Sequence, residues 1–118
     1  DGNETYRVFG YALSVLATVV SRPAPEYAIV DAGFKALATD RPFGPEVRSP
    51  DGASYRFNGD EHGRLYLAPG DRDIKVGDRA ELIVQHCDPN INLYDRMFCV
   101  RGDQVEAVWR ISARGMSQ

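Results

Sequence analysis

The chain has 118 residues, of which 43% are hydrophobic and 26% are charged, and its formal net charge is −3. This length predicts one domain with its own hydrophobic core. The negative charge and the scarcity of lysine (only Lys35 and Lys75) exclude a basic stripe for nucleic acid, and Cys87 and Cys99 are too few for a disulfide scaffold.

The longest apolar run, residues 11–20, is too short to cross a bilayer, and it contains Ser14 and Thr18. It also lacks the basic start and the cleavage site of a signal peptide. We therefore expect a cytoplasmic protein with no membrane partner.

Alternating apolar and polar residues, rich in β-branched and aromatic types, predict strands along most of the chain. The breaks at Pro23 and Pro25 favour a hairpin between the first two strands, and Gly102-Asp103 favours a tight turn between the last two. Segment 40–52 contains three prolines and two glycines, which predicts a loop. The expected strands are 12–22, 26–33, 54–59, 63–69, 79–86, 95–102 and 104–112.

These elements predict an all-β domain, a compact antiparallel barrel or sandwich of about seven to nine strands. Glycine and proline punctuate the chain about every ten residues, as in domains built from short strands. Residues 31–40 have room for one short helical turn at most.

The polar stretch 84–95, VQHCDPNINLYD, begins in the strand predicted at 79–86. Residues i and i+2 of a strand share a face, so His86 and Asp88 are expected to point one way and Cys87 the other. Pro89 biases Asp88 toward extended backbone, which favours continuation of the strand. An imidazole nitrogen and a carboxylate oxygen on one face can bind a divalent ion and leave coordination positions open, as in a catalytic site.

Two other interpretations of this stretch stay open. An H-x-D pair is also typical of a hydrogen-bonded strand end without metal. A redox role for Cys87 and Cys99 has less support, because there is no C-x-x-C motif and His86 is the only basic neighbour in sequence. The residues alone do not choose among manganese, zinc, cobalt and magnesium, although magnesium suits imidazole least.

Further blocks accompany the segment HCDPNINLYD (86–95) along the chain. They are ATVVSRPAPEYAIVDAGFKALATD (17–40), DEHGRL (60–65), KVGDRAELIVQHCDP (75–89) and VEAVWRISARG (105–115). In this order they closely resemble the C-terminal domain of D-threonine aldolases, over about residues 12–115. The chain thus resembles the family of D-threonine aldolase and D-serine dehydratase-like enzymes, which are similar in fold to alanine racemase (fold type III).

The resemblance implies that residues 1–118 are a single C-terminal β-domain of a larger enzyme. In that family an N-terminal TIM barrel binds pyridoxal phosphate through a Schiff-base lysine. The present chain has no room for a barrel of about 250 residues, and neither Lys35 nor Lys75 matches the cofactor lysine. The family also implies a homodimer with active sites near the subunit interface.

Carried onto this chain, the resemblance makes His86 and Asp88 the protein ligands of a divalent ion beside the cofactor, with manganese favoured. The ion would polarise the β-hydroxyl of a D-3-hydroxy-amino acid, which is cleaved to glycine and an aldehyde. In the dehydratase branch the second ligand is typically a cysteine, so Asp88 favours the aldolase branch. The chain alone is expected to be inactive, because it lacks the cofactor lysine.

Other polar residues are candidates for the same site. Asp60 is a candidate catalytic group at the pocket rim, and His62 is a candidate neighbour or third ligand of the metal; the alternative for both is a polar turn. Asp31 is a second candidate catalytic group, which would orient a partner in the active site. Candidates for holding His86 or Asp88 by hydrogen bonds, with loop capping as the alternative, are Asn92, Tyr94 and Asp95.

Two further hypotheses remain for the function. One is a D-serine dehydratase domain, which would yield pyruvate and ammonia. The other is a non-catalytic β-domain for dimerisation or binding. In the enzyme hypotheses the partners are the protein's own barrel and a small D-3-hydroxy-amino acid.

Overall fold

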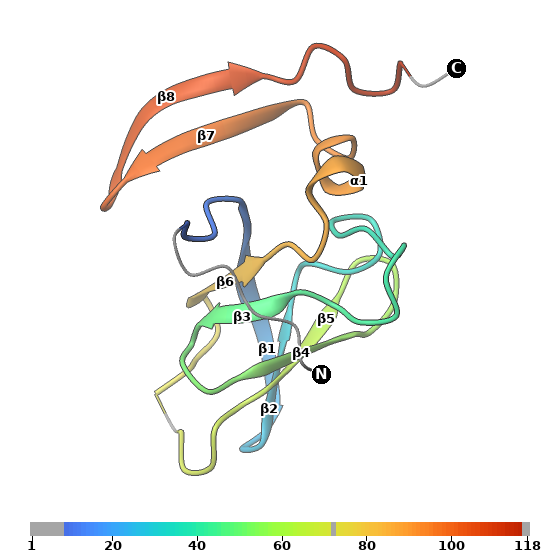
Figure 1. Cartoon of the computed structure of the whole chain (residues 1–118). Coiled ribbons are helices and arrows are strands. Elements are labelled where there is room, and N and C mark those ends of the chain that lie inside the picture. The colour runs from blue at the N-terminus through green and yellow to red at the C-terminus, as the bar shows by residue number, and fades with distance from the viewer. Residues whose placement is uncertain (1–8, 72, 117–118) are drawn as a thin grey trace.

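The computed structural model describes residues 9–71 and 73–116, which form eight strands and one short helix (Figure 1). No helix in these two ranges is long and apolar enough to cross a membrane. The helix α1 spans Cys87–Ile91. The strands are β1 Ser14–Ala24, β2 Tyr27–Val30, β3 Glu46–Ser49, β4 Ser54–Phe57, β5 Gly63–Tyr66, β6 Arg79–Ile83, β7 Arg96–Arg101 and β8 Gln104–Arg110.

Six of the strands form one antiparallel sheet in the order β3-β6-β1-β2-β5-β4. The two edge strands, β3 and β4, approach each other, so the sheet curls into a nearly closed barrel. Small residues allow this curvature: Ala17 of β1 lies opposite Ala80 of β6. The all-β class and the barrel-like architecture expected from the sequence are confirmed.

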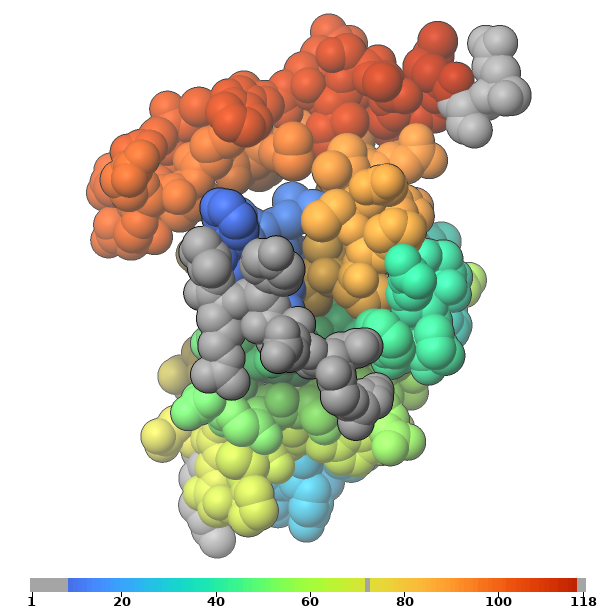
Figure 2. Space-filling model, in the orientation of Figure 1, coloured from blue at the N-terminus to red at the C-terminus, as the bar shows by residue number. Residues whose placement is uncertain are grey.

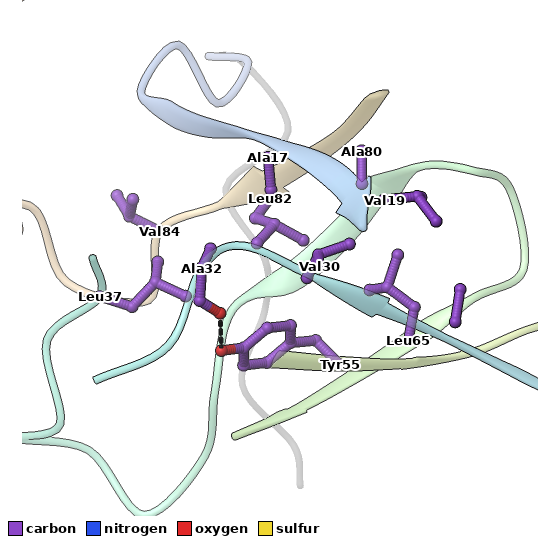
Figure 3. Packing of buried hydrophobic residues seen from close by; sticks show 11 residues of the cluster. Ala17, Val19, Val30, Ala32, Leu37, Tyr55, Leu65, Ala80, Leu82 and Val84 are labelled. Atoms are coloured by element: carbon purple, nitrogen blue, oxygen red, sulfur yellow. Dashed lines mark hydrogen bonds between the residues drawn. The ribbon is translucent and has the colours of Figure 1, made fainter. Parts of the chain in front are cut away.

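The core fills the inside of this curled sheet (Figure 3). In β6, Ala80 and Leu82 point inward as the two-residue period of a strand requires. Tyr55 of β4 crosses the core, and its hydroxyl donates a hydrogen bond of 2.6 Å to the carbonyl oxygen of Ala32. Gly63 is required beneath that ring, since a Cβ there would lie 2.1 Å from a Tyr55 ring atom.

Strands β7 and β8 form a separate two-stranded sheet. In Figures 1 and 2 this hairpin, orange to red, lies at one end of the molecule and extends beyond the larger sheet. None of its residues is buried. The turn expected at Gly102-Asp103 does join the two strands.

Two local expectations were wrong. The segment 40–52, expected to be a loop, contains β3, because Glu46–Ser49 pairs with β6 at the sheet edge. The strand expected at 79–86 ends at Ile83, and Asp88 is helical, so His86 and Asp88 do not share a strand face. Pro89 accounts for the error: it biases the preceding residue toward extended backbone, but proline also suits the first helical turn, and here α1 forms around it.

Candidate functional site

His86 stands at the junction between the large sheet and α1. It precedes the helix as its N-cap residue, with extended backbone (φ −155°, ψ 120°), and its side chain is 34% exposed. The Nδ1 atom lies 2.5 Å from Oδ2 of Asp40, which belongs to the connection between β2 and β3. The fold thus joins two side chains that are 46 residues apart in the chain.

The side chain of Asn90 ties the same two segments together through their main chains. Its Nδ2 donates to the carbonyl of His86 at 2.5 Å, and its Oδ1 accepts from the N–H of Ala38 at 3.1 Å. Gln85 Nε2 also donates to the Ala38 carbonyl. Asn90 is only 2% exposed. An amide buried with both ends satisfied is costly to break, so the His86 backbone is held firmly against residues 38–40.

Asp40 sits where its ionised form is favoured. The hydrogen bond with His86 lowers the pKa of this carboxyl below its ordinary value of 3.8; partial desolvation opposes that shift, and the charges of His86 and Arg41 add to it. The Nε atom of Arg41 lies 3.5 Å from the same Oδ2. At neutral pH Asp40 is therefore an anion that accepts hydrogen bonds only.

Asp88 lies in the first turn of α1, where its side chain is exposed and its charge is favourable to the helix. Within residues 9–71 and 73–116, no group of three or more His, Cys, Asp or Glu side chains is placed to hold a metal ion. An ion at the sequence-predicted ligands, Nε2 of His86 and an oxygen of Asp88, would thus have no third such side chain among the described residues. This nitrogen–oxygen donor pair suits manganese, cobalt or zinc, and the remaining positions would need ligands from elsewhere.

The predicted residues of the 59–62 loop lie against the segment that leads to Asp40. The carbonyl of Asp60 accepts the N–H of Lys35 at 3.0 Å, while its side chain, like that of His62, is exposed. Gly33 packs closely onto this loop: a Cβ at this position would lie 2.5 Å from the main-chain nitrogen of His62. The loop and the Asp40 segment are thus neighbours, whereas catalytic or metal roles for Asp60 and His62 stay predictions.

Asp31 makes a contact of a structural kind. Its Oδ1 accepts the N–H of Thr18 at 2.7 Å, and its own N–H donates to the Thr18 carbonyl at 3.1 Å. This exchange continues the β1–β2 pairing beyond the end of β2. A catalytic role for Asp31 stays a prediction.

The three loop residues after α1 direct their side chains to partners other than His86 and Asp88. Tyr94 donates its hydroxyl to the Ala36 carbonyl at 2.7 Å, and Asn92 Oδ1 accepts the Gly115 N–H at 2.7 Å. The Asp95 carboxylate lies 3.3 Å from Arg114. Tyr94 therefore anchors the main chain of the 36–40 segment at Ala36. Any direct role of these three residues at a metal stays a prediction.

A hollow of about 560 Å³ adjoins the Asp40 loop. Thr39 and Arg41, on either side of Asp40 in the chain, both line it, as do the rings of Phe34 and Phe57, which stack at 4.7 Å. The hollow is thus lined by aromatic rings together with the side chains of Arg41 and Arg56, and Arg41 adjoins the residue that contacts His86.

The residues that hold His86, namely Asp40 and Asn90, were not singled out by the sequence analysis. Both lie in blocks that carry the family resemblance. Asp40 ends the block of residues 17–40, and Asn90 follows the Asp88-Pro89 pair. No local pattern marks either one, because the contacts that join the two segments, Asp40 with His86 and Asn90 with Ala38, span 46 and 52 residues. The available signal is limited to the presence of an acid and an amide inside blocks that resemble the family.

Comparison with known proteins shows the family to which the chain belongs. A family profile described as "Putative serine dehydratase domain" matches residues 12–100. The chain is 41% identical to D-threonine aldolase of Arthrobacter sp over 111 residues, and 41% identical to 3-hydroxy-D-aspartate aldolase of Paracoccus denitrificans over 104 residues. These alignments cover 93% and 88% of the chain, but only 29% and 26% of the relatives.

Solved structures show the same fold. The structure of D-threonine aldolase from Filomicrobium marinum superposes with a TM-score of 0.84 at 34% identity, and covers 92% of this chain and 29% of that one. D-threo-3-hydroxyaspartate dehydratase from Delftia sp. HT23 superposes with a TM-score of 0.67 at 25% identity, over 82% of this chain and 31% of that one. The chain therefore spans less than a third of the relatives it matches, and it belongs to the D-serine dehydratase-like domain family, whose members include aldolases and dehydratases.

Proposed function

We propose that this chain is the metal-binding β-domain of a pyridoxal-phosphate-dependent lyase of the D-threonine aldolase type. The full enzyme would cleave D-3-hydroxy-amino acids to glycine and an aldehyde. The observation that carries the proposal is the setting of His86: Asp40 occupies Nδ1, Nε2 remains for a ligand, and the Asp88 carboxylate follows two residues later. The two aldolases at 41% identity support the choice of reaction class.

The pyridoxal phosphate is assigned to the rest of a longer protein. The chain corresponds to 29% of the D-threonine aldolase relative, which leaves ample length for a cofactor-binding barrel. The only two lysines are both engaged at the surface: Lys35 pairs with Glu61, and Lys75 lies 3.3 Å from Asp78. Neither is a candidate for a Schiff-base lysine, so this domain would supply part of the pocket wall and ligands for the ion.

The donor set fits a divalent ion of the borderline kind, with manganese favoured. Nε2 of His86 would supply a nitrogen ligand, and Asp88 would supply an anionic oxygen. When bound, such an ion polarises a substrate hydroxyl, and pyridoxal phosphate takes up the electrons of the broken bond. The residues of this chain would fix the place of the ion and, through the Asp40 loop, shape the adjacent aromatic hollow.

A dehydratase is the second candidate, favoured by the matching family profile and by the likeness to D-threo-3-hydroxyaspartate dehydratase. The same ligands would then help a hydroxide leave rather than promote carbon–carbon cleavage. A non-catalytic role in dimerisation or binding is the third candidate, and the exposed hairpin favours it. A homodimer in the full-length enzyme remains part of the proposal.

The test is a product assay on the full-length enzyme with pyridoxal phosphate and manganese. D-threonine, D-serine and D-3-hydroxyaspartate would be compared in the wild type, in His86→Ala and in Asp88→Ala, with Asp103→Ala as the control for loss of an exposed carboxylate. Glycine plus an aldehyde, reduced more than about 100-fold in the two ligand variants alone, would support the aldolase. A 2-oxo acid plus ammonia would assign the dehydratase, and no product with any substrate would favour the non-catalytic role.

A further inference from the structure

The contact between His86 and Asp40 determines which ring nitrogen carries the proton. An ionised carboxylate only accepts hydrogen bonds, so the Nδ1 atom at 2.5 Å must donate. A neutral imidazole has one N–H, and when Nδ1 holds it the lone pair is on Nε2. Unconstrained histidine populates both arrangements, which means that the carboxylate selects one of them.

Asp40 is held in place by a neighbouring guanidinium and by the main chain that leads to it. The guanidinium of Arg41 lies 3.5 Å from the oxygen that faces His86, and keeps negative charge there. Two residues earlier, Ala38 is bonded through its N–H to Asn90 and through its carbonyl to Gln85. The carboxylate and the imidazole are therefore carried by two main-chain segments that are bonded to each other. Turning the ring would break its own contact with Asp40.

The exposure of the pair indicates that its role is not mainly to stabilise the fold. The side chains of His86 and Asp40 are 34% and 37% exposed, and ion pairs in such positions contribute little to stability. The Asn90 amide, buried in the same place, already joins the two segments. The additional effect of the Asp40 carboxylate is therefore on the His86 ring, namely on its orientation and on which nitrogen carries the proton.

We propose that Asp40 is a positioning residue that holds His86 in the Nδ1–H form and presents its Nε2 lone pair as a metal ligand. Carboxylates bonded to the far nitrogen of a ligating histidine fix its orientation and increase its basicity in metal sites generally. The part of this inference that concerns the ion rests on the proposed function. The part that concerns the ring proton does not, so the two can fail separately.

The first experiment is nuclear magnetic resonance of the chain labelled with ¹⁵N in its histidine rings, at a pH where they are neutral. The chain has two histidines, so the exposed His62 serves as an internal reference. Long-range ring correlations should show Nδ1–H for His86 in the wild type and in Asp40→Asn, whose amide oxygen still accepts. Asp40→Ala should lose this preference, and Asp51→Ala, which removes an exposed turn carboxylate, should keep it.

The second experiment measures manganese retained by the full-length enzyme after dialysis against graded chelator. Asp40→Ala should weaken retention about 10–100-fold and Asp40→Asn less, with no change in Asp51→Ala and unchanged unfolding midpoints in all three variants. An Nε2–H ring at His86 in the wild type, or an Asp40→Ala variant with unaltered ring and retention, would overturn the proposal. A different outcome would refute the metal site itself. If His86 has the Nδ1–H form but His86→Ala retains manganese as the wild type does, then His86 is not a ligand and Asp40 has no role toward an ion.

Discussion

The six-stranded sheet and the β7–β8 hairpin are built from similar residues but are buried very differently. Leu82 in the sheet is 0% exposed, whereas Phe98 in the hairpin is 60% exposed. Both regions alternate along their strands and both are rich in β-branched and aromatic residues. The difference lies in closure: the sheet curls until its two edges approach each other and encloses its own core, whereas a single hairpin has nothing to enclose.

The hairpin is apolar on both faces. Cross-strand partners share a face, so Phe98 and Val108 lie on one side while Met97 and Trp109 lie on the other. An isolated two-stranded ribbon of this kind is marginally stable in water, and its exposed apolar faces are typical of surfaces that contact another layer of protein. Alternation in the sequence therefore predicts a strand, but burial depends on what lies above and below it.

The largest expected effect separates the core of the sheet from the exposed hairpin. Leu82→Ala should reduce the free energy of unfolding by about 2–5 kcal/mol, because it leaves a cavity in a closed core. Phe98→Ala removes a larger side chain but should change the free energy by less than about 0.5 kcal/mol, since that ring is mostly in solvent. Urea unfolding followed by far-ultraviolet circular dichroism measures both. Equal losses would mean that the hairpin packs on the sheet in solution.

Much of the larger sheet could be predicted from the sequence, since strand period and turn residues are local signals. Five of its six strands were expected; β3 was not, because prolines on both sides of Glu46–Ser49 obscure a short edge strand whose pairing with β6 is non-local. The same limit applies to the site. His86 and Asp88 stand out by spacing, whereas Asp40 and Asn90 join the two segments through contacts that span 46 and 52 residues.

The next effect concerns the bridge between the sheet and α1. Asn90→Ala should cost about 1–3 kcal/mol, because the carbonyl of His86 and the N–H of Ala38 would lose their shared partner inside the protein. Asn58→Ala, at an exposed position, is the matched control and should be close to neutral. Urea titration of both variants measures the difference. A neutral Asn90→Ala would show that the junction is hydrated, and would weaken the case for a rigid site.

A smaller effect, of about 1 kcal/mol, is expected for Tyr55→Phe, which deletes the buried hydrogen bond to the Ala32 carbonyl. Burial also raises the pKa of Tyr55 well above its ordinary value of 10.0. The unfolded chain therefore releases this proton at lower pH than the folded chain does, so stability is complete below pH 10.0 and falls as the pH rises above it.

Unfolding midpoints between neutral pH and pH 11 or so should show this alkaline loss in the wild type and a shallower loss in Tyr55→Phe. A slope remains in the variant because burial raises the pKa of Tyr94 as well. The exposed Tyr66→Phe is the control for removal of a hydroxyl. The hairpin strands contain no tyrosine, so the tyrosine contribution to this pH dependence comes from outside the hairpin. Identical slopes in all three proteins would contradict the assignment to Tyr55.

The smallest expected effect is on the hairpin side of the comparison. Trp109, the only tryptophan of the chain, lies on β8 and is 61% exposed, so its fluorescence reports on the hairpin while circular dichroism is dominated by the sheet. Trp109→Phe should change the free energy of unfolding of the sheet by less than about 0.5 kcal/mol.

In the wild type the tryptophan emission should resemble that of tryptophan in water. It should change at lower urea concentration than the circular dichroism does, because a ribbon without a core opens locally before the sheet unfolds. Coincident transitions would show that the two regions unfold as one unit. In the full-length enzyme proposed above, by contrast, a blue-shifted emission from the same residue would show that another layer of protein covers the hairpin there.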